Sequence, residues 1–335
     1  MPNTDLFTTI PQSIKHHRET FAQNIRNIAR LSEDHGYKGI FIFSDNRLAD
    51  PWTIAGFVLA ETKVLLPIIS LQPAYMHPYM AAKKISSLAL LYKRKVALHL
   101  VAGGFSNDLI ALNEHTEHDR RFDRLAEYTL ITQELLRSDE PVSFKGDFYK
   151  IKNLRLRPSI PDALQPQYFL SGSSNAARKA AESLHAKLIE NPEPYHTWKT
   201  RHNDSTPSVA IRIGIIARNN HDDALKEARS RFPVTPDGTM MHHLDVKFSG
   251  FYTNKSYSGK SEQNERKESV YWLEPFEHNH TLCPYLVGNY EEVSVELSRY
   301  LSSGCDTCIL DIPVTNQELI HTLQTFEIAE KLILP

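Results

Sequence analysis

The feature that most constrains the fold of this 335-residue chain is the alternation of eight short apolar runs with amphipathic helical patterns. Strands separated by helices pair in parallel, and eight such units predict an α/β fold of the (β/α)8 TIM-barrel type more readily than an open sheet. The expected strands are residues 5–9, 39–44, 64–71, 96–102, 168–171, 186–190, 209–217 and 307–312. The expected helices are residues 20–35, 52–60, 78–92, 120–137, 174–185, 194–202, 222–231, 291–302 and 316–331.

Two segments interrupt this repeat. Residues 141–158 alternate in polarity around Lys145-Gly146-Asp147, which predicts a hairpin inserted after a helix. Residues 235–289 follow the seventh strand, have weak periodicity and combine polar runs with large aromatic side chains. Loops of this length in a compact enzyme are often lids, and the alternative is a contact surface for a partner. We expect one barrel domain over residues 1–335 that carries both insertions.

Charge and cysteine content exclude several classes of protein. The formal net charge of −2 gives no electrostatic reason to expect nucleic acid, and no apolar run reaches the length of a membrane span. Residues 1–12 are too polar for a signal peptide, and three cysteines cannot build a disulfide framework, so a cytoplasmic location is expected. Cys305-Asp-Thr-Cys308 has the C-x-x-C spacing but no second ligand pair, and we expect a structural role and no metal site.

The fifth expected strand runs into a turn suited to phosphate binding. Tyr168-Phe-Leu-Ser-Gly-Ser-Ser174 is followed at once by the helical pattern of residues 175–185. Backbone N–H groups at a helix N-terminus and the positive end of the helix dipole attract a phosphate, and the Ser173 and Ser174 hydroxyls can add hydrogen bonds. The alternative is an ordinary serine cap.

The seventh expected strand contains one charge, Arg212, among apolar residues. Period-two alternation groups Arg212 with Ala210, Gly214 and Ile216 on one face of the strand. We expect Arg212 to point into the barrel mouth and to serve an anionic ligand or the reaction, with Gly214 opening space beside it. A structural ion pair is the alternative.

A set of short motifs stands in a characteristic order along the chain. They are Gly36-Tyr-Lys-Gly-Ile, Asp50-Pro-Trp, Gln72-Pro, His77-Pro-Tyr-Met-Ala-Ala, Leu98-His-Leu-Val-Ala-Gly103, His118-Asp-Arg-Arg-Phe-Asp-Arg, Phe144-Lys-Gly, Ser171-Gly-Ser-Ser, Leu286-Val-Gly288 and Cys308-Ile-Leu-Asp-Ile-Pro313. This order resembles the bacterial luciferase-like flavin monooxygenases, and among them most closely the alkanesulfonate monooxygenases. The resemblance covers nearly the whole chain except residues 235–280.

The resemblance implies an enzyme that takes reduced FMN from a separate flavin reductase and binds O2. Such an enzyme oxygenates a small-molecule or carrier-tethered substrate through a C4a-peroxyflavin and forms a homodimer or homotetramer. By resemblance, Ser173 and Ser174 hold the FMN phosphate with Gly172 in the turn. Phe122 stands where the family has a phosphate-contacting Tyr, and Arg121 can supply charge beside it.

The remaining residues of the implied site lie at other strand ends. His99 and Ala102 stand on the strand that passes under the flavin ring, and His99 joins Arg212 as a catalytic candidate, with a core histidine as the alternative. The substrate side is implied to comprise Leu48, Trp52, Gln72 and Gly214.

Three departures from the sulfonate enzymes predict a different substrate. Leu48 replaces their Cys, Gly214 replaces their His, and Ile312 replaces their Tyr. Two further classes stay open: a deazaflavin (F420) or flavin oxidoreductase on the same barrel, and a catalytically reduced flavin-binding or partner protein.

Overall fold

The computed structural model describes residues 3–13, 17–103, 106–202, 207–233, 269–278 and 280–333. These residues form two compact units. The N-terminal unit comprises Ile10–Glu33 and Gly39–Leu188, and the C-terminal unit comprises Met1–Thr9, Asp34–Lys38 and Ile189–Pro335. Residues 235–268 of the expected insertion lie outside the described residues, so a lid or contact surface there stays a prediction.

Eight strands confirm the predicted α/β fold of the TIM-barrel type, and each overlaps one of the eight apolar runs, with ends that differ from the expected ones by up to two residues. They are β1 (Asp5–Thr9), β2 (Gly39–Ile42), β3 (Leu66–Leu71), β4 (Ala97–Leu100), β7 (Gln167–Ser171), β8 (Lys187–Glu190), β9 (Val209–Arg218) and β12 (Cys305–Leu310). Their hydrogen-bonded order is β9-β12-β1-β2-β3-β4-β7-β8, and β8 pairs again with β9. The parallel sheet therefore closes on itself.

The nine predicted helices are present, with ends that the sequence explains. They are α1 (Arg18–Asp34), α2 (Pro51–Glu61), α3 (Pro78–Tyr92), α5 (His118–Arg137), α6 (Asn175–Leu184), α7 (Tyr195–Arg201), α8 (His221–Arg231), α12 (Tyr290–Ser302) and α13 (Asn316–Ile333). Asp50 caps α2 by accepting a hydrogen bond from the Thr53 N–H, and Pro51 occupies the first helical position. Among the described helices, none has the length and apolar character needed to cross a membrane.

Several short elements were not predicted. They are α4 (Ser106–Ala111), a 3-10 turn η2 (Asp162–Leu164), β10 (Tyr271–Trp272), α11 (Glu274–Glu277) and β11 (Tyr285–Asn289). Elements of two to six residues leave little periodicity for a sequence pattern to detect. The predicted hairpin is present as the antiparallel pair β5 (Val142–Lys145) and β6 (Lys150–Leu154).

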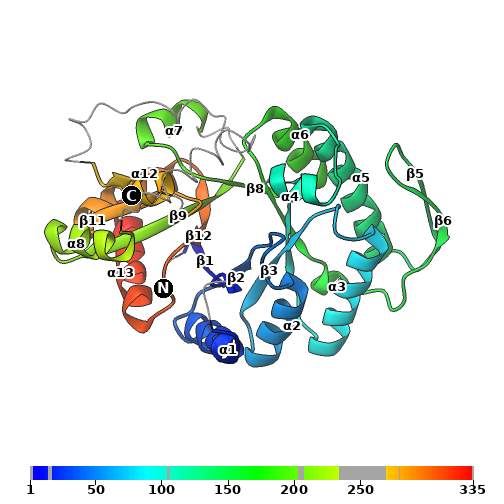
Figure 1. Ribbon diagram of the computed structural model, residues 1–335, viewed down its shortest axis with the longest axis horizontal. Coiled ribbons are helices and arrows are strands. Elements are labelled where there is room, and N and C mark those ends of the chain that lie inside the picture. Colours follow the sequence, from blue (N-terminus) through cyan, green and yellow to red (C-terminus); the bar gives the residue numbers. More distant parts are fainter. Residues whose placement is uncertain are drawn as a thin grey trace. The chain divides into compact units, whose positions relative to one another are not determined.

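In the N-terminal unit, the two faces of the parallel strands have different neighbours. Leu98 and Leu100 of β4 pack in one core cluster with Ala81 and Ile85 of α3 and Leu125 of α5. These helices lie along the outer side of the strands (Figure 1). The alternate residues of β3, β4 and β7 therefore face away from the helices, toward the barrel interior.

In the C-terminal unit, β9 is longer than its barrel neighbours and changes partner along its length. Residues 209–213 pair with β12, whereas residues 214–218 pair with β11. Ile216 packs with Ala224 and Ala228 of α8, so the expected alternation of β9 does not hold beyond residue 213. The expected open space beside Gly214 is also wrong, because the Tyr285 ring of β11 fills the position that a Cβ would take.

This close approach predicts that residue 214 accepts no side chain. Gly214→Ala should lower the free energy of unfolding by about 1–3 kcal/mol, because the added methyl group overpacks against the Tyr285 ring. Gly56→Ala in α2 is the control: its Cβ would meet Leu88 at 3.8 Å, an ordinary contact, and should stabilise the helix by about 0.5–1 kcal/mol. Urea unfolding measures both variants. A Gly214→Ala protein as stable as the parent would contradict this packing.

Candidate functional site

Three polar side chains from neighbouring strands form a hydrogen-bonded row in the N-terminal unit. The Ser70 hydroxyl of β3 lies 2.9 Å from His99 Nδ1 of β4, and His99 Nε2 lies 2.7 Å from the Ser171 hydroxyl of β7. Ser70 and His99 are 3% and 7% exposed, and Ser171 is half-buried. The Phe41 ring packs against the imidazole at a centroid distance of 5.0 Å. Protein groups therefore engage both nitrogens of His99.

The backbone of the turn after β7 lies close to neighbouring side chains at Gly172. Gly172 has φ +150°, and a Cβ there would lie 2.6 Å from Ala177 Cβ and 3.4 Å from Phe122 Cζ. Only glycine fits this conformation and this space. The Ser174 hydroxyl caps α6 by accepting a hydrogen bond from the Ala177 N–H at 3.1 Å. Ser173 is exposed and lies with the first N–H groups of α6 at the helix N-terminus, where an anion can bind.

The start of α5 lies against this turn and contributes charge. Phe122 is 6% exposed, and its ring contacts the position of Gly172. Arg121 is half-buried, and its Nε finds no hydrogen-bond partner among the described residues. Burial lowers the pKa of the Arg121 guanidinium, and the Arg124 charge lowers it further, while the Glu114 carboxylate raises it. A buried cation with an unused donor is suited to an anionic ligand.

The Glu114 carboxylate balances this cationic region. Burial by itself would raise the pKa of Glu114, but hydrogen bonds from Thr116 and from the Arg124 guanidinium outweigh it and lower the pKa to about 2. Glu114 therefore stays ionised at neutral pH and pairs with Arg124.

The expected substrate residues of the N-terminal unit differ in how they are placed. Leu48 is half-buried in the loop after β2, and Gln72 follows β3 with 8% of its surface exposed. Trp52 belongs to the core cluster beneath the helices, with the Lys84 ammonium 5.8 Å from its ring centroid. Ala102 is 6% exposed after β4. Trp52 thus has a packing role in the described contacts.

In the C-terminal unit, Arg212 belongs to a cluster at the carboxyl end of β12. Arg212 Nη2 lies 3.9 Å from Asp311 Oδ2, and the Cys283 thiol lies 3.5 Å from the same oxygen. The Tyr285 hydroxyl donates to the Asp311 carbonyl oxygen. Burial raises the pKa of Cys283 well above its usual value, and the Asp311 charge adds to the increase. The thiol therefore remains protonated and donates.

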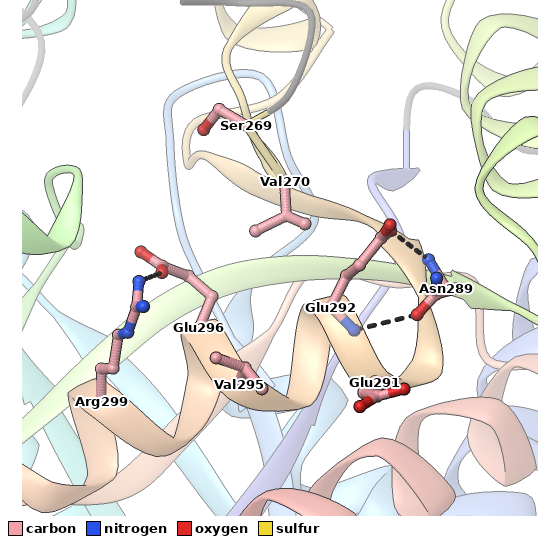
Figure 2. A pocket seen from close by; sticks show the side chains of 8 residues that line it. All are labelled: Ser269, Val270, Asn289, Glu291, Glu292, Val295, Glu296 and Arg299. Atoms are coloured by element: carbon pink, nitrogen blue, oxygen red, sulfur yellow. Dashed lines mark hydrogen bonds and ion pairs between the residues drawn. The ribbon is translucent and has the colours of Figure 1, made fainter.

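A pocket of about 590 Å³ lies elsewhere in this unit, along α12 (Figure 2). None of the predicted site residues lines it. Its lining includes the carboxylates of Glu291, Glu292 and Glu296 and one guanidinium, that of Arg299, which pairs with Glu296 at 2.7 Å. Figure 2 shows this pair and the capping box of Glu292 with Asn289. This excess of carboxylates does not suit the phosphate of a flavin.

Sequence reasoning missed four residues that contact the predicted ones. They are Ser70, Ser171, Asp311 and Tyr285. A signal existed for Ser70, the single hydroxyl in the buried strand Leu66–Leu71, and for Asp311, an acid directly after an apolar strand. Tyr285 had none, because its position depends on how β11 pairs with β9.

Comparison with known proteins places these features in a family. The family model "Luciferase-like monooxygenase" matches residues 3–307. A curated relative from Niallia circulans, 4-(gamma-L-glutamylamino)butanoyl-[BtrI acyl-carrier protein] monooxygenase, is 30% identical over 309 residues, which cover 91% of this chain and 90% of the relative.

Solved structures share the fold at lower identity. A long-chain alkane monooxygenase superposes with a TM-score of 0.74 at 16% identity, covering 99% of this chain and 92% of that one. An F420-dependent secondary alcohol dehydrogenase superposes with a TM-score of 0.64 at 18% identity, covering 97% of this chain and 99% of that one. The fold is thus shared with a monooxygenase and with an F420-dependent dehydrogenase.

Proposed function

The chain belongs to the luciferase-like monooxygenase family, and from this premise we propose that it uses reduced FMN to oxygenate an acyl group tethered to a carrier protein. The observation that carries the cofactor assignment is the β7–α6 turn. Gly172 excludes a side chain where a phosphate would approach, and Ser173 and Ser174 stand at the helix N-terminus. The buried, unpaired Nε of Arg121 beside Phe122 fits the same anion.

The residues on the turn bind and orient the cofactor. N–H groups of α6 and the hydroxyls of Ser173 and Ser174 hold the phosphate, and Arg121 balances its charge. Bound reduced FMN supplies the activation of O2, and a separate flavin reductase supplies the reduced FMN in transient encounters. His99 of β4 contacts Ser171 of β7, whereas Ala102 follows β4 and belongs to the core cluster of this unit.

Arg212 is proposed as the catalytic cation of the C-terminal unit. The Arg212 guanidinium lies 3.9 Å from the Asp311 carboxylate. The Arg212 side chain is 14% exposed and the Asp311 side chain is 27% exposed. A fixed cation of this kind stabilises negative charge that develops on a substrate or cofactor oxygen. Leu48 and Gln72 of the N-terminal unit are assigned to the substrate side, where the carbon chain of an acyl group would need apolar neighbours. Gly214 is not, because the Tyr285 ring occupies the space beside it.

The substrate class rests on the relative from Niallia circulans, whose name gives a carrier-bound acyl substrate. Leu48, a half-buried apolar side chain in the loop after β2, is compatible with an acyl chain. A cytoplasmic homodimer or homotetramer is the assembly that we propose for the enzyme.

The substrate proposal is tested by supplying a flavin reductase, FMN and O2 with the 4-(gamma-L-glutamylamino)butanoyl thioester of an acyl-carrier protein. The expected result is the gain of one oxygen atom on the carrier-bound acyl group, detected by mass spectrometry. The free acid, offered at the same concentration, should react at least about tenfold more slowly, because the carrier contributes binding energy. Equal rates for the two substrates would overturn the carrier assignment.

The phosphate turn predicts a specific loss of cofactor affinity. Ser173→Ala/Ser174→Ala should weaken FMN binding by about tenfold, since two hydroxyl donors and a helix cap are removed. Ser183→Ala, which removes a hydroxyl from the other end of α6, is the control and should bind FMN as the parent does. Reduced FMN and reduced F420 are titrated in parallel. Tighter binding of F420 would favour the oxidoreductase alternative.

Substitutions of two arginines of β9 are expected to separate an effect on turnover from an effect on stability. Arg212→Met should reduce turnover at least about tenfold and lower the free energy of unfolding by less than about 1 kcal/mol, because its described ion pair is long and partly exposed. Arg218→Met should instead destabilise the protein by about 1–3 kcal/mol, since it removes a close pair with the buried Glu318 carboxylate, which keeps Arg231 at 3.0 Å. Normal turnover in a folded Arg212→Met protein would remove Arg212 from the catalytic machinery.

A further inference from the structure

We propose that Ser171 is a third hydroxyl donor to the bound flavin, and that Ser70 is a positioning residue that sets its direction through His99. The role of Ser171 toward a flavin rests on the proposed function. The hydrogen-bond row itself is a property of the protein alone, so it can be tested without any cofactor.

The register of the sheet places the three side chains on one face. Ser70 is the direct partner of His99 in the β3–β4 ladder, and His99 is the partner of Phe169 in the β4–β7 ladder. Ser171 follows two residues after Phe169, so it shares the face of Phe169. The intervening residues Leu98 and Leu100 pack under the helices. The row therefore crosses three strands on the interior face.

The Ser70 hydroxyl decides which nitrogen of His99 carries the proton. Ser70 is 3% exposed, and its hydroxyl makes one hydrogen bond among the described residues, to His99 Nδ1. If Nδ1 carried the proton, it would donate to Ser70 Oγ, and the buried Ser70 O–H would have no described acceptor. An unsatisfied buried donor disfavours that form by roughly thirtyfold in population, which corresponds to about 2 kcal/mol. The favoured arrangement has Ser70 donating to an unprotonated Nδ1.

This arrangement fixes the direction of the whole row. A neutral imidazole with an unprotonated Nδ1 carries its proton on Nε2, which donates to Ser171 Oγ at 2.7 Å. The Ser171 O–H is then not used by His99 and remains a donor. Ser171 is the last residue of β7 and directly precedes Gly172, so this donor lies beside the phosphate turn.

The Ser171 hydroxyl, as a donor, fits a hydrogen-bond acceptor on the ligand. A flavin offers two kinds of acceptor, its phosphoryl oxygens and its ring carbonyl oxygens. Both nitrogens of His99 are occupied in this arrangement, and the Phe41 ring limits its rotation. His99 is therefore assigned a positioning role in place of the catalytic role expected from the sequence.

The first measurement uses the flavin-free protein. Histidine labelled with 15N reports the tautomer through the chemical shifts of its two ring nitrogens, and the signals of His99 are identified by their loss in His99→Asn. At pH 7.5 we expect a neutral ring with the proton on Nε2. Ser70→Ala should shift the population toward the form with the proton on Nδ1, because that form no longer leaves a buried Ser70 hydroxyl without an acceptor. A ring with its proton on Nδ1, or a doubly protonated ring, in the parent protein would overturn the row.

The second measurement is flavin affinity in a double-mutant cycle. Ser171→Ala should weaken flavin binding about fivefold, the effect of one hydrogen bond. Ser70→Ala, which is expected to act only through His99, should weaken it by a smaller factor in the parent background and have no effect in the Ser171→Ala background. Ser70→Thr retains the hydroxyl and should restore the parent affinity. Ser86→Ala removes another buried hydroxyl of the same unit, one that donates to the Pro158 carbonyl at 2.6 Å, and should leave affinity unchanged.

Riboflavin and FMN distinguish the two acceptors. A loss on Ser171→Ala with FMN alone assigns the contact to the phosphate, and an equal loss with both ligands assigns it to the ring. Unchanged affinity in Ser171→Ala for both ligands would overturn its role as a donor. A parent protein that binds neither ligand would overturn the proposed function and the role of Ser171 with it, whereas the tautomer measurement would still decide whether the row exists.

Discussion

Backbone hydrogen bonding between the parallel strands β3, β4 and β7 is the constraint on which the candidate site depends. One register pairs Ser70 with His99 and His99 with Phe169, so it decides which side chains meet on the interior face. A slip of one residue would turn every one of these side chains to the opposite face. The apolar residues between them, packed beneath α3 and α5, hold the register because the same slip would expose them.

The turn that follows β7 connects this strand to the N-terminus of α6, where we propose that the cofactor phosphate binds. Gly172 adopts a conformation that other residues rarely take, and the close approach of Ala177 and Phe122 leaves no room for a side chain. Ser174 then caps α6, so the helix begins at a defined position relative to the strand. The polar row ends at Ser171 and the turn begins at Gly172. The proposed cofactor-binding turn and the strand register are therefore adjacent in the chain.

In the C-terminal unit, the pairing of β9 with β11 determines the surroundings of Arg212. The second half of β9 pairs with β11 and packs against α8, and the Tyr285 ring occupies the space above Gly214. Tyr285 also donates to the Asp311 carbonyl, and the Asp311 carboxylate pairs with Arg212. The position of Arg212 thus depends on a strand that has no place in a simple eightfold repeat.

The sequence by itself determined the eight barrel strands, the nine helices between and after them, the hairpin and the glycine-serine turn that begins α6, because each produces a local pattern of period, capping or glycine use. The motif order also identified the family. Only the tertiary structure decided that His99 has both nitrogens engaged, that Asp311 and Cys283 lie beside Arg212, and that Tyr285 fills the space at Gly214. These contacts join residues that are from 28 to 99 positions apart along the chain. Local periodicity carries no information about such pairs, since the pairing of strands and the packing of rings bring them together.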